Sequence, residues 1–217
     1  LAGWETLGNV SIASTASNAS ALDIGLDASI AGNHYALLST EIVSGSSSSD
    51  LESFLDLSSG LLSSFHSDQD PSRLFLDSSG LKRTVIVEAG QQLEFDWKFT
   101  GNDEKPYNDT FITVAGSSAT SVASVYSVGD YGQERGVFEY VFSEPGQYVV
   151  GVAIMDEQDS NRDSYLAVDN FRLSSASQAP QIDQSGFSLM SLEIDASDIS
   201  GLKFHPGLNA SDKPFSD

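Results

Sequence analysis

Alternating apolar and polar side chains recur along most of the first 173 residues. The alternation is least interrupted over 92–99, where the polar positions are Glu94, Asp96 and Lys98. The apolar positions of this segment are Leu93, Phe95, Trp97 and Phe99. Successive side chains of a β-strand point to opposite faces of a sheet. The pattern therefore predicts a half-buried strand over 92–99, with Trp97 in the core.

Similar patterns, separated by turns rich in Gly and Pro, predict a series of further strands. Their ranges are 3–12, 35–40, 81–87, 110–115, 136–142, 147–155 and 164–173. The segment 117–127 is weakly patterned. One short helix is predicted over 50–57, capped by Ser49 or Asp50, because apolar residues recur there at helical spacing. Strands in such regular succession are typical of an all-β, antiparallel β-sandwich of the jelly-roll type.

The composition changes after residue 174, where a serine-rich stretch runs to Pro180. We expect a calcium-binding, ligand-binding β-sandwich domain over 1–174, followed by a linker and C-terminal extension over 175–217. The sequence starts at Leu1 without a methionine or a signal peptide. It is therefore expected to be a segment of a longer chain, with neighbouring domains of that chain among its partners.

The chain is strongly acidic, with 31 Asp and Glu against 10 Lys and Arg and a formal charge of −21. Nucleic acids and anionic membranes bind basic surfaces, so neither is an expected partner. No apolar run is long enough to cross a bilayer, which argues against membrane insertion. Bound divalent cations or high external salt would offset the self-repulsion of such a chain, and both indicate a location outside the cytoplasm. Because cysteine is absent, disulfides cannot stabilise the fold there.

Two acidic loops between predicted strands are candidate calcium sites, because Ca²⁺ binds six to eight oxygen ligands. Asp159, Asn161 and Asp163 occupy alternate positions, like the first half of an EF-hand loop, but Ser164 and Asn170 stand where that loop needs Gly and Glu. The loop is therefore not an EF-hand. The expected ligands from both loops are Asp103, Glu104, Asp109, Asp156, Asp159, Asn161 and Asp163. The alternative is a pair of solvated acidic loops in an acidic protein.

Glu5 and Asp169 form a second candidate metal site. If the first and last strands are neighbours, the two carboxylates can reach one ion and tie the ends of the sandwich together. Asp169 follows an apolar strand and precedes Phe171, so partial burial is expected, and a buried carboxylate needs a partner. The alternative is a surface Glu and a turn Asp.

Catalysis is weakly supported, so the chain is predicted not to be an enzyme. His34, His66 and His205 lack the spacing of zinc ligands, and the sequence has no nucleophile elbow or phosphate-binding glycine loop. The adjacent Asp103 and Glu104 could serve glycoside hydrolysis, but such pairs arise by chance in an acidic chain. Aromatic residues that could contact a sugar or a peptide are Trp4, Tyr107, Tyr126, Tyr131 and Tyr140.

Several short motifs together resemble the calcium-binding jelly-roll modules of large bacterial RTX-type adhesins. They are Gly3-Trp4-Glu5, 36–40 (ALLST), 51–55 (LESFL), 93–99 (LEFDWKF), 107–111 (YNDTF) and 168–173 (VDNFRL). The resemblance spans about residues 3–173 and is nearest to the peptide-binding type. It implies a secreted, cell-surface module that binds the free C-terminus of a target protein with the help of Ca²⁺, for cell adhesion and biofilm formation.

The calcium ligands that this resemblance implies are Asp103, Glu104, Asp109, Asp156, Asp159, Asp163, Glu5 and Asp169. The expected ligand-contacting residues are Asn102, Tyr107, Asn108 and Tyr131. Two alternatives remain open, namely a lectin-like module that binds glycans and a structural extender domain in an adhesin stalk.

Overall fold

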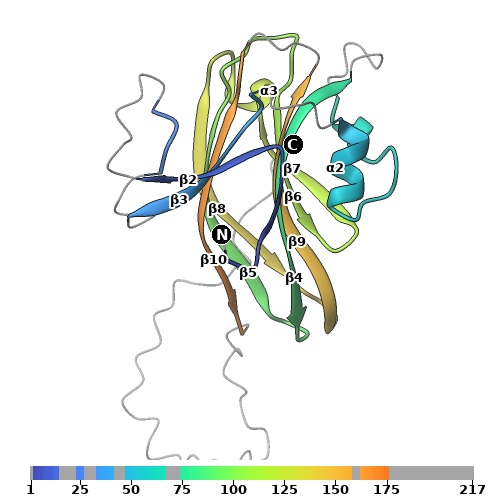
Figure 1. Cartoon of the computed structure of the whole chain (residues 1–217). Coiled ribbons are helices and arrows are strands. Elements are labelled where there is room, and N and C mark those ends of the chain that lie inside the picture. The colour runs from blue at the N-terminus through green and yellow to red at the C-terminus, as the bar shows by residue number, and fades with distance from the viewer. Residues whose placement is uncertain are drawn as a thin grey trace, which may run out of the picture. The chain divides into compact units, whose positions relative to one another are not determined.

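The chain folds into two five-stranded antiparallel sheets that face each other (Figure 1). This computed structural model describes residues 2–14, 23–26, 33–41, 47–66, 74–157 and 162–175. The first sheet has the strand order β1-β4-β9-β6-β7, and the second has the order β2-β3-β10-β5-β8. The predicted antiparallel β-sandwich is confirmed.

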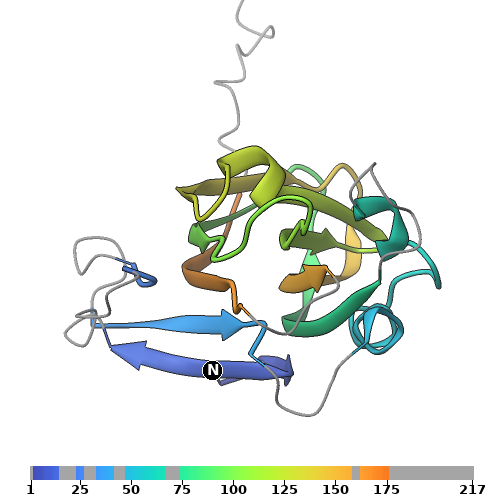
Figure 2. The same ribbon diagram turned by 90° about the horizontal axis from the view of Figure 1, so that it is seen from above.

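The strands of the first sheet are β1 (Glu5–Leu7), β4 (Phe75–Val87), β9 (Gly146–Glu157), β6 (Thr110–Ala115) and β7 (Ser118–Ser124). Those of the second are β2 (Asn9–Ser14), β3 (His34–Ser39), β10 (Tyr165–Ser174), β5 (Gln92–Thr100) and β8 (Gln133–Val141). Seen from above, β2 and β3 run side by side along one edge of the domain (Figure 2). Strands β4 and β8 both begin earlier than the sequence pattern predicts.

The core lies between the two sheets, where the apolar face of β5 meets the first sheet. All four apolar side chains predicted on that face are buried, and Trp97 is 6% exposed. The ring of Trp97 lies 5.4 Å from that of Phe111 on β6, centroid to centroid. The period-2 pattern of 92–99 therefore correctly predicts both the strand and its buried face.

The prediction of a single first strand over 3–12 is wrong, because the chain crosses from one sheet to the other at Gly8. Residue 8 has a φ of +71°, and a Cβ there would lie 2.4 Å from the carbonyl oxygen of Ser78. Beyond the crossing, the Asn9 amide donates to the Ser79 hydroxyl at 2.8 Å, and that hydroxyl donates to the carbonyl of Ser39 at 2.6 Å. The crossing therefore connects both sheets at the point where β1 ends and β2 begins.

Helix α2 (Ser48–Phe54) covers the outer face of the first sheet (Figure 1). Its Leu51 joins Phe75 of β4 and Met155 of β9 in a second apolar cluster. The helix is capped by Ser47, not by Ser49 or Asp50 as predicted. Asp50 is instead the third helical residue and completes a capping box with Ser47.

A 3₁₀-helix, η2 (Leu62–Phe65), follows α2 and is held to it by a buried carboxylate. The Glu52 side chain is buried and accepts hydrogen bonds from the amides of Gly60 and Leu62, each at 2.8 Å. The weakly patterned segment 117–127 forms all of β7 and most of a one-turn helix, α3 (Val125–Val128).

Several predicted features lie outside the described residues. They include Asp159, Asn161 and His205, together with all of the predicted extension except Ser175. The division between a domain and an extension therefore stays a prediction. None of the helices in the described part of the chain is long and apolar enough to cross a membrane.

Candidate functional site

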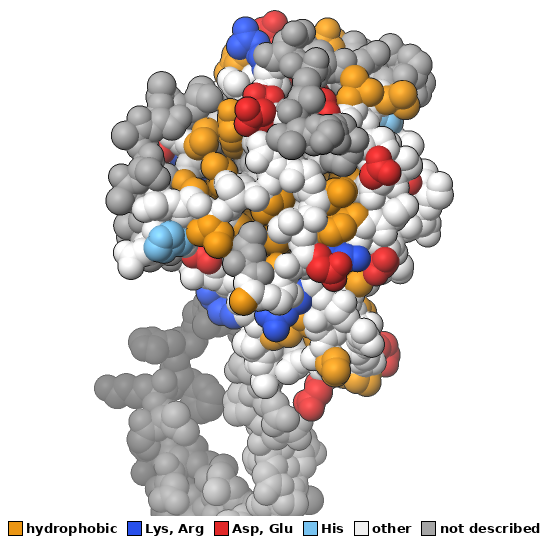
Figure 3. Space-filling view, in the orientation of Figure 1, with side chains coloured by type: hydrophobic (Ala, Val, Ile, Leu, Met, Phe, Trp, Pro, Cys, Tyr) orange, Lys and Arg blue, Asp and Glu red, His pale blue; other side chains and the backbone are white. Residues whose placement is uncertain are grey.

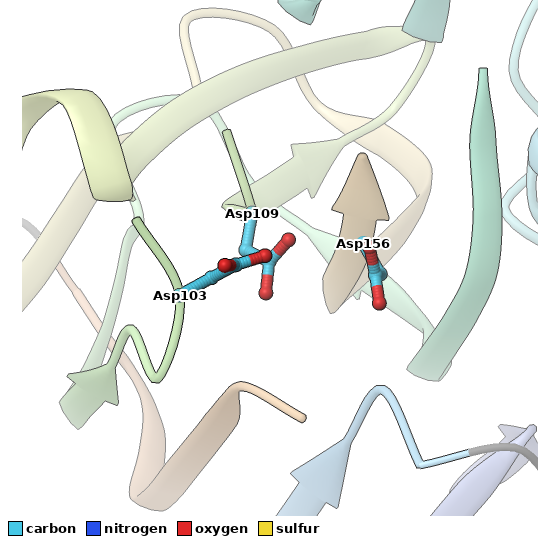
Figure 4. A group of neighbouring side chains, drawn as sticks. All are labelled: Asp103, Asp109 and Asp156. Carbon is cyan, nitrogen blue, oxygen red and sulfur yellow. The ribbon is translucent and has the colours of Figure 1, made fainter. Parts of the chain in front are cut away.

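Three buried aspartates from different parts of the chain come together at one end of the sandwich (Figure 4). Asp103 lies in the loop after β5, Asp109 directly precedes β6, and Asp156 is near the end of β9. One carboxylate oxygen from each lies within 4.8 Å of the others, and each residue is at most 1% exposed. We call this cluster the acidic triad. It unites the two acidic loops that the sequence singles out.

Hydrogen bonds from the surrounding backbone and from Ser164 fix the orientation of two triad members, Asp103 and Asp109. The Asp109 carboxylate accepts from the amide of Glu157 at 3.2 Å and from the hydroxyl of Ser164. The Asp103 carboxylate accepts from the amide of Glu104 at 2.7 Å. Hydrogen bonds of this kind stabilise the ionised form of a carboxylate, which is the form that binds a metal ion.

The spacing of the triad fits a calcium ion. Like charges this close repel one another strongly in a region shielded from water, and a divalent cation would reverse that energy. Oxygens bound to Ca²⁺ lie about 2.4 Å from the ion, so two of them are at most about 4.8 Å apart. Asp103, Asp109 and Asp156 meet that limit. They would provide three of the six to eight oxygens that such an ion takes.

A fourth buried carboxylate, Glu157, lies next to the triad but faces other partners. It accepts a hydrogen bond from the amide of Asn108 at 3.0 Å, and its other oxygen lies 3.8 Å from Nδ1 of His66. The imidazole of His66 stacks on Phe75, with 4.3 Å between centroids. Burial lowers the pKa of His66, and the charge of Glu157 opposes that shift. The surroundings of His66 therefore favour its neutral form. Through its hydrogen bond with the amide of Asn108, Glu157 mainly positions the loop that contains Asn108.

The remaining candidate ligands of the two loops are placed differently. Glu104 is exposed and accepts a hydrogen bond from the hydroxyl of Tyr131 at 2.8 Å. Asp163 is half-buried, and its pKa is raised by burial and, to a smaller extent, by the charges of Glu41 and Asp77. Its surroundings therefore carry excess negative charge as well.

Glu5 and Asp169 lie in different sheets. Glu5 lies on β1 opposite Lys82 of β4, whereas Asp169 lies on β10 opposite Asp96 of β5. The expectation that the first and last strands are neighbours is wrong, because β1 and β10 belong to different sheets. The single ion that the two carboxylates were expected to share stays a prediction.

Two of the four expected ligand-contacting residues support the loop itself. The side-chain oxygen of Asn108 accepts from the amide of Tyr126 at 3.0 Å, and Asn108 is buried. The hydroxyl of Tyr131 binds Glu104, and the guanidinium of Arg162 lies 5.0 Å from the Tyr131 ring. Asn102 and Tyr107 are half-buried. Of these four residues, Tyr131 is the most accessible to a ligand.

A second surface region, away from the triad, has the shape of a ligand site. Two cavities of about 430 Å³ and about 370 Å³ share Trp4 and Phe171 in their walls. The two rings pack with 4.5 Å between centroids, and Phe171 in turn stacks on the core residue Phe95 at 4.5 Å. We call the larger space the Arg83 cavity and the smaller one the Asp169 cavity, after a polar residue in the wall of each. Both volumes are typical of small-ligand sites.

Polar groups surround the Asp169 cavity. Its wall includes His34, Asp169 and Asn170, beside the aromatic pair. Burial raises the pKa of Asp169, and the nearby Asp96 raises it further, against a backbone hydrogen bond from Asn170. The side-chain amide of Asn170 donates a hydrogen bond to the carboxylate of Asp96 at 2.7 Å, so its orientation is fixed. Sequence reasoning noted Trp4 and Asp169 but not their proximity, which depends on how the two sheets pack.

Comparisons with known proteins give only distant similarities. No protein-family model matches the sequence, and no curated protein matches it significantly. Solved structures that resemble the chain include carbohydrate-binding modules. One is TmCBM61 in complex with β-1,4-galactotriose, with 13% identity, a TM-score of 0.38, and coverage of 79% of this chain and 88% of that chain.

Another is the CBM22-1 xylan-binding domain of Xyn10C from Paenibacillus barcinonensis, with 10% identity, a TM-score of 0.33, and coverage of 80% of this chain and 86% of that chain. A third structure comes from carbohydrate-binding modules of the β-sandwich superfamily with promiscuous specificity. It has 9% identity and a TM-score of 0.40, and the match covers 80% of this chain and 58% of that chain. At such scores the assignment of the fold rests on the two sheets of this chain, not on the superpositions.

Proposed function

We propose that this chain is a non-catalytic glycan-binding module, stabilised by calcium and working outside the cell as part of a longer adhesin. The observation that carries the proposal is the pair Trp4 and Phe171, which forms a common wall between two surface cavities with polar rims. The apolar face of a sugar ring packs on an aromatic side chain, while its hydroxyls need fixed polar partners. The Asp169 cavity offers both.

The calcium part of the proposal rests on the acidic triad. An ion bound by Asp103, Asp109 and Asp156 would join the loop after β5 to the ends of β6 and β9. Because all three side chains are buried, this ion would stabilise the fold without touching a ligand. The same burial argues against glycoside hydrolysis by Asp103 with Glu104, since a hydrolytic carboxyl group must reach the sugar.

A peptide ligand is the second candidate, and it depends on the resemblance to the peptide-binding modules of RTX-type adhesins. It would place the ligand near Tyr131, above the acidic loops. The engagement of Asn108 and Tyr131 within the loop makes this the weaker proposal. The setting in a secreted bacterial adhesin, with a role in adhesion and biofilm formation, comes from the same resemblance and from the acidic composition. An extender without any ligand would leave the two cavities unexplained.

Binding of the full chain to glycan arrays and to peptides with a free C-terminal carboxylate, each with and without Ca²⁺, tests the proposal. Trp4→Ala should abolish glycan binding, and Tyr131→Ala should leave it intact. Loss of binding in Tyr131→Ala but not in Trp4→Ala, or binding to peptides alone, would favour the second candidate. Melting temperatures of both variants, measured in Ca²⁺, show whether a loss of binding comes from unfolding.

A further inference from the structure

The Arg83 cavity contains a cation where the strand pattern would place an apolar side chain. Along β4, Leu81 and Val87 are buried in the core, and Val85 packs against it. Arg83 lies on the same side of the strand, because alternate residues point the same way, but it is exposed and reaches the mouth of the cavity. Its guanidinium lies close to the turn before β1, where a Cβ on Gly3 would be 3.7 Å from Cζ of Arg83.

A second arginine contributes to the same cavity from the facing sheet. Arg172 lies on β10, its side chain is 51% exposed, and it donates a hydrogen bond to Glu94. Arg83, by contrast, has no hydrogen bond or ion pair with any residue that the structure describes. Arg83 is therefore the cation with more of its donors available to a ligand.

This concentration of positive charge is unusual for the chain. Only 10 of the 217 residues are Lys or Arg, and the formal charge is −21, yet two arginines line one cavity. Figure 3 shows Lys and Arg side chains gathered at the lower end of the domain, where β4 and β10 end in Figure 1. A cation at the mouth of an apolar space creates a local site for an anion within an otherwise repulsive field.

We propose that the Arg83 cavity binds the carboxylate of an acidic sugar, that is, a uronate residue of a glycan; this rests on the glycan-binding function proposed above. The planar guanidinium can donate two parallel hydrogen bonds to a carboxylate, an arrangement that an ammonium group does not offer. Trp4 and Phe171 then pack against the ring that carries the carboxylate. Val85, Leu93 and Val150 close the apolar side of the cavity.

The charge of the Asp169 cavity determines which kind of sugar residue can bind next to the uronate. Trp4 and Phe171 line both cavities, so the sugar next to a uronate bound in the Arg83 cavity would lie across this aromatic pair, at the Asp169 cavity. Asp169 lies in the wall of the second cavity, with Asp96 near it. A second carboxylate there would meet like charge, whereas sugar hydroxyls can donate to these oxygens. The structure therefore favours a uronate beside a neutral sugar over a run of uronates.

Calorimetric titration with matched pairs of ligands tests this inference. The first pair is a xylotriose bearing one glucuronate, and the same compound with its carboxyl group reduced to an alcohol. The second is digalacturonate and its dimethyl ester. We expect the full chain in Ca²⁺ to bind the glucuronate compound at least tenfold more tightly than its reduced form, and to discriminate less within the digalacturonate pair. Arg83→Met should remove the preference and leave binding of the reduced compound unchanged, and Arg135→Met, on β8, should change neither.

The outcomes separate the two proposals. Equal binding of the acidic and reduced compounds would overturn the inference while leaving the glycan-binding function in place. Binding of neither, in either pair or on the arrays, would overturn both. An Arg83-dependent preference for peptides with a free C-terminal carboxylate would overturn the assignment to a sugar. If Arg83→Met lowers the melting temperature, Arg83→Lys is used as the test variant instead. Because lysine keeps the positive charge, part of the preference for the glucuronate compound should then survive.

Discussion

The hydroxyl of Ser164, just before β10, donates a hydrogen bond to the carboxylate of Asp109, just before β6. The same hydroxyl accepts from the amide of Asn102 at 3.1 Å, and the Ser164 amide donates to the Thr40 hydroxyl at 3.0 Å. One fully buried serine thus connects the loop that carries the triad to the start of the last strand. Asp109 is therefore held in place by a contact that needs no metal ion.

The first prediction concerns calcium and the triad. Asp109→Asn and Asp156→Asn should each abolish the rise in melting temperature that Ca²⁺ produces, which for an ion at a hundred times its Kd corresponds to about 2.7 kcal/mol. In the presence of a chelator, Asp156→Asn should raise the melting temperature, because it removes one of three mutually repelling buried charges. Calorimetry in Ca²⁺ and in chelator measures both effects.

Glu88→Gln is the matched control, because it removes an exposed carboxylate from the turn before β5, at the opposite end of that strand from Asp103. It should leave the response to Ca²⁺ unchanged. A calcium response that persists at full size in both triad variants would show that the ion binds elsewhere.

The second prediction concerns the buried carboxylate of Glu52. Glu52→Ala leaves the amides of Gly60 and Leu62 without their acceptor, at a cost of about 1–3 kcal/mol for each donor. Chemical denaturation should show a loss of roughly 2–5 kcal/mol in the free energy of unfolding. Glu52→Gln keeps one acceptor oxygen and should lose less. Equal losses in the two variants would contradict the assignment of both hydrogen bonds.

The third prediction uses two glycines with positive φ. Gly60 has a φ of +82°, and a Cβ added there would have no atom of the described residues within 4 Å. Gly60→Ala should therefore cost only the left-handed backbone strain of about 1–2 kcal/mol. Gly8→Ala adds a contact of 2.4 Å with a backbone oxygen and should destabilise the protein clearly more. Equal free energies of unfolding for the two variants would mean that the crossing between sheets relaxes easily.

The fourth prediction concerns the start of α2. Ser47→Ala removes the cap and should lower the free energy of unfolding by about 1 kcal/mol. Hydrogen bonds from Ser47 lower the pKa of Asp50 below its ordinary value of 3.8. The stabilisation is therefore complete above that value and is lost as the pH falls through the lower pKa of the folded protein. The difference between the wild type and Ser47→Ala should shrink over that acidic range; a constant difference would contradict the role of Asp50.

The sequence predicts most of the strands because their period-2 pattern reflects a sheet with one buried face. Residues 92–99 show this most clearly. The crossing at Gly8 is missed although Gly8 and Asn9 are turn residues that interrupt the pattern of 3–12, because a turn signal does not show that the chain passes to the other sheet. The need for glycine comes from the approach of Ser78, which is distant in sequence. The cap at Ser47 is missed because several serines in succession are equally good candidates.

Of the two candidate sites, one is also predicted from the sequence and the other is not. Sequence reasoning finds the acidic triad because both loops are rich in carboxylates, and β6 pairs with β9 so that Asp109 and Asp156 reach the same end of the sheet. It does not find the Arg83 cavity. The alternation of 81–87 places Arg83 on the same side of the strand as Leu81 and Val87, but the cavity exists only because Trp4, Phe171 and Arg172 pack beside it, which the local pattern does not show.

Because β1 and β2 belong to different sheets, the order in which the chain folds during synthesis is affected. Among the strands of the described residues, β1 pairs only with β4 and β2 only with β3, which in turn needs β10 at its other edge. The second sheet therefore stays open until residues 165–174 have emerged, and partners so distant in sequence are slow to meet. The hairpin of β6 and β7 can form early. The amino-terminal strands, although made first, are expected to be among the last to dock.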